Sequence, residues 1–462
     1  MVGSVVDRPA ATRQRTGLVL TALIIGVVSF QLNATMVTPA MPDIARTLGT
    51  TTDLVGLSQT MFLLIGGLAG VVLSRLSDHV GRRKVLVISL LVMSAGSLIA
   101  MLAPNIGVLI AARVLQGASG ATFQLTYLIL RDVLSPKQFG QALGLVTAIN
   151  GGVGGLDGLA GGALADTVGF RAVFAVILGL GVIAALMAGR FVPETHAGTG
   201  GRMDWAGAVA LTGALAALNL GISQGNDQGW LSPLALGLLI GGAVLLAVFW
   251  RVENRVGEPL MAARHLRSRQ VWPLVATTLL ALTGVFCAIN FTVVLLSQDE
   301  QLGYGMNATL SALMFLAPPA VIGLASGPVA GWLAPRVGWR LVLRVGLALS
   351  IASLVFAAAF ADSRWLVFAA FIGLGIGYNG LVMTTLSGLG VVLSPKESPG
   401  ALPGMNGAAF GIGASLGIGI VAPTVDGGDY HTALWISVAV TALALVASFL
   451  IKPPSTTEGE NI

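Results

Sequence analysis

Runs of about 20 apolar residues recur from one end of this chain of 462 residues to the other. A helix rises ~1.5 Å per residue, so a helix of that length crosses the ~30 Å hydrocarbon core of a bilayer. Only 10% of the residues are charged, against about 25% in soluble domains. The sequence therefore predicts an all-α polytopic membrane protein and excludes soluble enzyme folds.

Fourteen segments have this apolar character, and we expect a transmembrane helix from each. The first is too long for a signal-peptide core and has no small-residue cleavage site, and the seventh is marginal in length. The segments are residues 17–40, 54–73, 85–103, 106–127, 140–163, 172–192, 206–222, 231–250, 272–297, 309–333, 341–361, 365–389, 401–423 and 432–451.

The placement of Lys and Arg predicts the orientation of these helices. If the connecting segments alternate between the two sides of the membrane, 21 of the 25 basic residues fall on one side and 3 on the other, with Arg113 inside a segment. Basic residues mark the cytoplasmic side. We therefore expect both termini in the cytoplasm and a multi-pass protein of the cell (plasma or inner) membrane.

The chain repeats itself at a nearly constant offset. Residues 70–86 align without gaps on 327–343, and the sequence Leu-Ser-Pro-Lys at 134–137 recurs at 393–396. Such repeats are typical of secondary transporters. We expect two six-helix bundles at 17–192 and 271–451, a linker with helices 7 and 8 at 193–270, and cytoplasmic tails at 1–16 and 452–462.

Two charged residues, Arg113 and Asp157, lie well inside apolar segments. A charged group in hydrocarbon costs several kcal/mol, so each is a candidate functional residue. Both are expected about 10 Å below the outer surface on neighbouring helices, where they can pair directly or bridge through water. A purely structural ion pair is the alternative interpretation. The glycines around Asp157, such as the pair Gly158 and Gly162, have the spacing of closely packed membrane helices.

Polar side chains recur at helical spacing near these two charges. They are Arg113, Gln116, Gln124 and Tyr127 in the fourth segment, Asn150 and Asp157 in the fifth, and Asn33 in the first. A polar face on a membrane helix most simply lines a water-filled cavity, and packing between helices is the alternative.

The second half contributes neutral polar groups to the expected cavity. They are Asn290, Tyr378, Asn379 and Asn406. We predict that they contact the substrate together with apolar side chains, although amides also join membrane helices to one another. Cys287 is expected to be a small packing residue.

Three stretches of the sequence resemble motifs of the major facilitator superfamily. Residues 76–84 read Leu-Ser-Asp-His-Val-Gly-Arg-Arg-Lys and are similar to its signature loop. Residues 113–120 read Arg-Val-Leu-Gln-Gly-Ala-Ser-Gly and resemble its second motif, and residues 154–162 occupy the place of the antiporter motif. The layout of fourteen helices resembles the drug–proton antiporter branch.

The resemblance implies a conformational gate at the cytoplasmic side. It assigns to Asp78 a contact with the other half that locks the outward-facing state. Gly81 permits the tight turn, Arg82 and Arg83 anchor the loop at the anionic inner leaflet, and Asp132 is expected to pair with one of these arginines. The alternative is that these charges only set the topology.

The sequence departs from this family at two positions. Many members of the branch carry an acid in the first helix where this chain has Asn33, and the usual Gly-Pro of the fifth helix is replaced by Asp157-Gly158. We therefore predict that the proton-coupling carboxylate has moved to Asp157, with Arg113 beside it. Proton binding there would release a cationic substrate, and substrate binding would release the proton.

The favoured function is proton-coupled export of small amphipathic compounds by alternating access. The alternative is a proton symporter or facilitator for an anionic or neutral metabolite, with Arg113 binding an anionic group. The expected partners are a small-molecule substrate, protons and the lipid bilayer. We expect no enzyme activity, cofactor, metal or nucleic acid, and the absence of a P-loop motif argues against direct use of ATP.

Overall fold

The computed structural model describes residues 10–134, 156–195, 205–229, 231–253, 271–393 and 401–451, and the single residues 138, 142, 146 and 255. Within these residues every regular element is a helix, and thirteen helices are long and apolar enough to cross a membrane. The predicted fifth helix, 140–163, is described only in part, and its described end is helical over 156–167. The predicted all-α membrane fold is confirmed.

The first half of the chain forms one group of helices. Its elements are α1 (Ala10–Thr35), the 3₁₀ turn η1 (Thr38–Ala40), α2 (Met41–Leu48), α3 (Thr52–Val80), α4 (Arg82–Met101), α5 (Ile106–Gly117), the 3₁₀ turn η2 (Ala118–Ala121), α6 (Thr122–Val133), the helix 156–167 and α8 (Phe170–Phe191). Within this half, α4 packs along α8 and α5, and α8 also packs along α1. We call these residues the N-half.

The last part of the chain, which we call the C-half, forms a second group. Its elements are α12 (Trp272–Ala281), the π turns η3 (Leu282–Phe286) and η4 (Ala288–Thr292), α13 (Val293–Gln298), α14 (Ala308–Ser311), the π turn η5 (Ala312–Leu316), α15 (Ala317–Val337), α16 (Trp339–Ala359), α17 (Arg364–Leu374), the π turn η6 (Gly375–Val382), α18 (Met383–Val392), α19 (Ala401–Asp426) and α20 (Tyr430–Ser448). Here α16 packs along α20, and α15 packs against η6.

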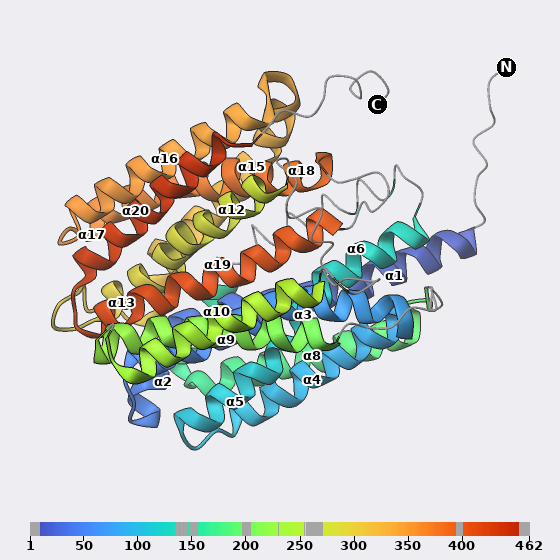
Figure 1. The fold of residues 1–462 in the computed structure, drawn as a ribbon, viewed down its shortest axis with the longest axis horizontal. Helices are drawn as coiled ribbons and strands as arrows, with labels where there is room; N and C mark the ends of the chain where they lie inside the picture. The colour runs from blue at the N-terminus through green and yellow to red at the C-terminus, as the bar shows by residue number, and fades with distance from the viewer. Residues whose placement is uncertain are drawn as a thin grey trace.

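The two halves meet most extensively along α3 and α19, which lie side by side in Figure 1. Glycines allow their backbones to touch. A Cβ atom added to Gly411 would lie 2.7 Å from the Cα atom of Gly67, and one added to Gly67 would lie 2.9 Å from the carbonyl oxygen of Ala408. Small residues at a membrane helix crossing permit this approach, so a larger side chain at either glycine would separate the halves.

A helical hairpin covers this seam. It consists of α9 (Trp205–Gln228) and α10 (Pro233–Glu253), which pack against each other, and α9 also contacts both α3 and α19 (Figure 1). These are the two extra helices of the predicted linker. Because α9 contacts one helix of each half, the hairpin lies across the boundary between the halves.

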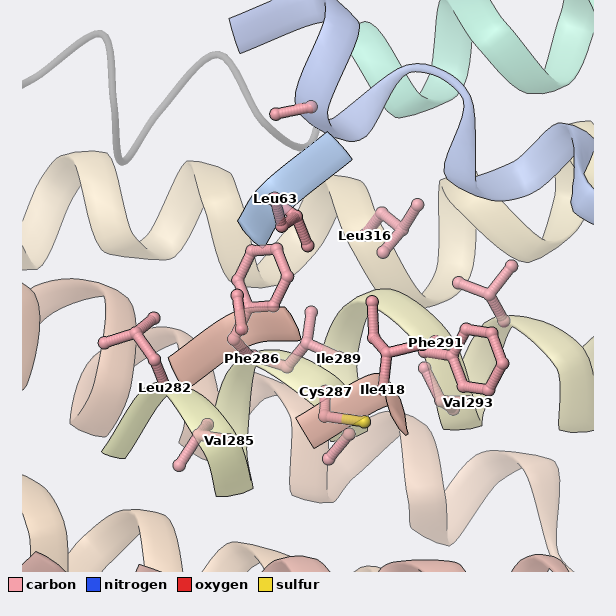
Figure 2. Packing of buried hydrophobic residues seen from close by; sticks show 14 of the residues in the cluster. Leu63, Leu282, Val285, Phe286, Cys287, Ile289, Phe291, Val293, Leu316 and Ile418 are labelled. Atoms are coloured by element: carbon pink, nitrogen blue, oxygen red, sulfur yellow. The ribbon is translucent and has the colours of Figure 1, made fainter. Parts of the chain in front are cut away.

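Buried apolar side chains from both halves form a continuous cluster beside the seam. Figure 2 shows Leu63 of α3 close to Phe286 and Ile289 of the C-half. The ring of Phe291 packs so closely on α3 that a Cβ atom at Gly56 would lie 2.9 Å from it. Cys287 is fully buried in the same cluster, as expected for a packing residue. Apolar side chains of the two halves are therefore in contact within this cluster.

Candidate functional site

Arg113 lies on α5 and is fully buried. Its Nη1 donates to Oδ1 of Asn33 at 2.5 Å, to the backbone oxygen of Asn33 at 3.2 Å and to Oε1 of Gln116 at 2.8 Å. Its Nη2 donates to Oε1 of Gln59, and its guanidinium carbon lies 4.0 Å from the ring centroid of Phe62. Neutral oxygens and an aromatic face therefore surround this buried cation.

Further hydrogen bonds fix the amides that hold Arg113. Gln59 donates from Nε2 to the backbone oxygen of Ala34 at 2.7 Å, and Gln116 donates from Nε2 to Oγ of Ser97 at 2.9 Å. Each glutamine therefore presents its oxygen to the guanidinium. The site thus joins α1, α3, α4 and α5 around one charge.

Gln59 is a site residue that the sequence analysis missed. It is buried on α3 and accepts directly from Arg113. The signal was available, because a lone glutamine inside an apolar segment follows the same logic that singled out Gln116. Its depth below the predicted outer end of its segment is also similar to that of Asn33.

Asp157 lies near the start of the described helix 156–167 and is 4% exposed. Its Oδ2 is 2.6 Å from Oγ1 of Thr35 on α1. The same hydroxyl lies 2.9 Å from the backbone oxygen of Gln31 and 3.4 Å from Nε2 of Gln31. Within the described parts of the chain, no Lys, Arg or His forms an ion pair with this carboxylate.

Arg113 and Asp157 do not pair directly. Instead, each binds the C-terminal end of α1, where Arg113 contacts Asn33 and Asp157 contacts Thr35. Residues two apart on a helix point in directions about 200° apart, so α1 lies between the two charges. The direct pairing considered from the sequence is therefore not found, and α1 is what the two sites share.

The glycines around Asp157 bring its helix against both halves. A Cβ atom at Gly161 would overlap the backbone oxygen of Met36, at the end of α1. One at Gly158 would lie 2.9 Å from Cδ1 of Leu316, and one at Gly162 would lie 2.6 Å from the backbone oxygen of Ala308. Helix 156–167 thus packs closely against the end of α1 on one side and against the C-half on another.

The amides predicted for the C-half form hydrogen bonds within or between its helices. Asn290 donates to the backbone oxygen of Phe286 at 3.2 Å, and Asn379 donates to that of Pro319 at 3.1 Å. Asn406 accepts from Thr278 and donates to the backbone of α18. The contacts of Asn379 and Asn406 join separate segments and fit the packing alternative, whereas that of Asn290 lies within its own helical segment. The predicted substrate contacts of these three residues stay predictions.

The remaining cavity candidates lie at different places. The side chain of Gln124 reaches between Gly70 on α3 and Gly407 on α19, where the halves meet. Tyr127 packs beside Phe123 with ring centroids 6.3 Å apart. Tyr378 is buried in the C-half core. Asn150 lies outside the described residues.

The predicted gate loop is bound to its own half. Arg82 pairs with Asp132 and donates to the backbone oxygen of Leu128 at 3.1 Å. The pairing of Asp132 with one of the two arginines is thus as expected.

The turn of this loop explains its glycine. Gly81 has a φ angle of 111°, and a Cβ atom there would lie 2.6 Å from Oε1 of Glu194, which accepts from the backbone N–H of Arg83 at 3.1 Å. The side chain of Asp78 lies outside the described residues, so its gating contact stays a prediction.

Comparison with known proteins agrees with the motifs and the fold. Residues 23–418 match the Major Facilitator Superfamily, and the chain belongs to this superfamily of membrane transporters. It is 39% identical over 418 residues to a uridine/deoxyuridine transporter of Lactococcus lactis subsp. cremoris, a match that covers 88% of this chain and 87% of that protein.

Relatives of lower sequence identity are named for drug or antibiotic resistance. The multidrug resistance protein Stp of Mycobacterium tuberculosis is 29% identical, over 87% of this chain and 75% of that protein. The tetracenomycin C resistance and export protein of Streptomyces glaucescens is also 29% identical, over 88% and 76%. The fold also matches the crystal structure of the human organic anion transporter MFSD10, with a TM-score of 0.65 and 17% sequence identity. The match covers 96% of this chain and all of the MFSD10 chain, and it shows that the two share a fold.

Proposed function

We propose that this chain is a proton-coupled symporter of a small neutral metabolite of the pyrimidine nucleoside class, with Asp157 carrying the coupling proton. This is the alternative function considered from the sequence. The observation that carries the proposal is the position of Asp157. Its carboxylate is buried, has no cationic partner among the described residues, and forms a hydrogen bond with the hydroxyl of Thr35.

The hydroxyl of Thr35 suits a carboxylate that changes its protonation state. A hydroxyl has one hydrogen to donate and can also accept. When Asp157 is ionised, Thr35 donates to Oδ2 across the 2.6 Å contact. When Asp157 is protonated, it donates to Thr35, whose hydrogen turns to the backbone oxygen of Gln31 at 2.9 Å. Both states are hydrogen-bonded, so neither leaves this contact unsatisfied.

The groups around Arg113 favour a neutral polar substrate. The oxygens of Gln59, Gln116 and Asn33 already accept from both Nη atoms of this cation, so a substrate needs no negative charge to satisfy those two donors. Asn33 is fully buried, and its Nδ2 donor has no hydrogen-bond partner among the described residues. A ligand with carbonyl and hydroxyl groups can satisfy such a donor. The relative that is 39% identical supports a nucleoside as the first ligand to test.

Proton-coupled drug export, the function favoured from the sequence, is the second candidate. The names of relatives that are 29% identical support it. Asp157 would then bind a proton and a cationic drug in turn. The two candidates differ in the charge of the substrate and in whether its binding takes up or releases a proton.

Transport by proteoliposomes tests the proposal. Wild type should accumulate labelled uridine when the trans-membrane pH gradient is imposed and should exchange it in counterflow when no gradient is present. Asp157→Asn should lose the accumulation and keep the counterflow, because exchange needs no net proton movement. Asp362→Asn, which changes an exposed outer acid, is the matched control and should behave as wild type.

Two results would contradict the proposal in different ways. Gradient-driven accumulation that survives in Asp157→Asn would place the coupling proton elsewhere. Failure of uridine and deoxyuridine to exchange, while a cationic dye is extruded, would favour the drug–proton antiporter instead.

A further inference from the structure

Hydrogen bonds join the two halves at the ends of helices that the basic residues predict to lie outside. Thr52 at the start of α3 donates to Oδ1 of Asp426 at the end of α19, at 2.5 Å. Gln298 at the end of α13 donates from Nε2 to the backbone oxygen of Pro39 at 3.1 Å. The structure is therefore closed at its predicted outer side.

Asp166 makes the densest of these contacts. Its Oδ1 accepts from the backbone N–H of Ala308 at 3.1 Å. Its Oδ2 accepts from the backbone N–H of Thr309 at 2.8 Å and from the hydroxyl of Thr309 at 2.5 Å. One carboxylate of the N-half thus receives three hydrogen bonds from the C-half.

These donors belong to the first turn of a helix, where backbone N–H groups have no partner inside the helix. The local cap, Asn307, accepts only from Leu310, at 2.8 Å. Asp166 therefore completes the cap of α14 from the other half of the molecule. The carboxylate also lies at the end of a helix where negative charge is favourable.

The helix that carries Asp166 also carries Asp157, on a different face. Asp157 and Gly161 face α1, because they contact Thr35 and Met36. Gly158, Gly162 and Asp166 are spaced by four residues and face the C-half. A movement that takes Asp166 away from Thr309 therefore displaces the helix that also carries Asp157.

We propose that Asp166 is an outer latch, which holds the outer side closed by capping α14, and that helix 156–167 links this latch to the contact between Asp157 and Thr35. The link to Asp157 rests on the proposed function, whereas the latch does not. When the outer side opens, the Asp166 carboxylate loses its three hydrogen bonds from Ala308 and Thr309 and is hydrated by water instead. Loss of the charge is expected to raise the ratio of outer-open to outer-closed molecules roughly tenfold.

The test measures the separation of the halves directly. Spin labels are placed on Arg46→Cys in the N-half and Glu300→Cys in the C-half, both exposed outer positions. Cys287 is fully buried and should stay unlabelled. The distance distribution between the two labels is then measured in detergent and in lipid nanodiscs, without substrate.

Asp166→Asn and Thr309→Val should both shift this distribution toward longer distances, and the double variant should shift it no further than Asp166→Asn alone, because the Thr309 hydroxyl donates to this carboxylate. Thr167→Ala is the matched control, because that hydroxyl donates only to Ala163 in its own helix, at 2.7 Å. A distribution that matches wild type in both Asp166→Asn and Thr309→Val would overturn the latch.

The same measurement separates the latch from the proposed function. Asp157→Asn fixes the neutral form at that position and should change the distribution, with an effect that is not additive with Asp166→Asn. Additive or absent effects would overturn the link between the two acids and leave the latch standing. Neither result depends on uridine or on a proton gradient, so failure of nucleoside transport would not affect it.

Discussion

Replacement of Gln59 by Leu should destabilise the folded protein strongly, although the side chains are similar in size. Gln59 Oε1 accepts from the buried guanidinium of Arg113, and its Nε2 donates to the backbone oxygen of Ala34 at 2.7 Å. Leucine leaves both groups buried without these partners. A buried group that loses its partner costs about 1–3 kcal/mol, so the two together cost roughly 2–6 kcal/mol.

The assay is thermal unfolding of the purified protein, followed by intrinsic fluorescence. Gln59→Leu should melt several degrees below wild type. Ser58→Ala is the matched control, since it removes a buried hydroxyl that donates within its own helix, to Val55 at 2.7 Å, and it should lower the melting temperature much less. Equal melting temperatures for Gln59→Leu and wild type would refute the view that Arg113 depends on this amide.

Two further substitutions test the contacts around Asp157. Thr35→Val should reduce gradient-driven uridine accumulation roughly tenfold, because one hydrogen bond to the carboxylate is lost, whereas Thr35→Ser should retain the accumulation. Uridine counterflow is the control measurement. Accumulation by the valine variant equal to that of wild type would contradict the role of the Thr35 hydroxyl beside Asp157. Gly161→Ala should lower the free energy of unfolding by about 1–3 kcal/mol, because the added methyl group overpacks against Met36. Its melting temperature should fall below that of the control Gly179→Ala, whose added methyl group has open space around it. Equal melting temperatures for the two variants would contradict the close packing at Gly161.

The helices were predictable because the length of each apolar segment reflects the thickness of the bilayer. The burial of Arg113 and Asp157 followed from the same pattern. Their partners did not, because the rotation of each helix decides which side chains meet. Depth alone placed Arg113 and Asp157 at one level, whereas the rotation of α1 puts Asn33 toward one and Thr35 toward the other.

The roles of polar residues were harder to predict than their positions. The sequence predicted that three amides of the C-half line the cavity, namely Asn290, Asn379 and Asn406. In the structure each forms a hydrogen bond with a nearby backbone oxygen or hydroxyl group. A lone amide in an apolar segment serves packing and binding equally well by composition. Asp166 gave no signal either, since an acid at the outer end of a helix is expected in water, and only the fold places the first turn of α14 beside it.

Proton exchange on ligand binding tests the central role of Asp157 most directly. Uridine is added to purified protein in weakly buffered solution, and a pH indicator reports the protons taken up while a parallel titration reports uridine bound. Wild type should take up about one proton per uridine bound, and Asp157→Asn should bind uridine with no proton uptake. The same proton uptake in both proteins would contradict the assignment of Asp157 as the proton carrier.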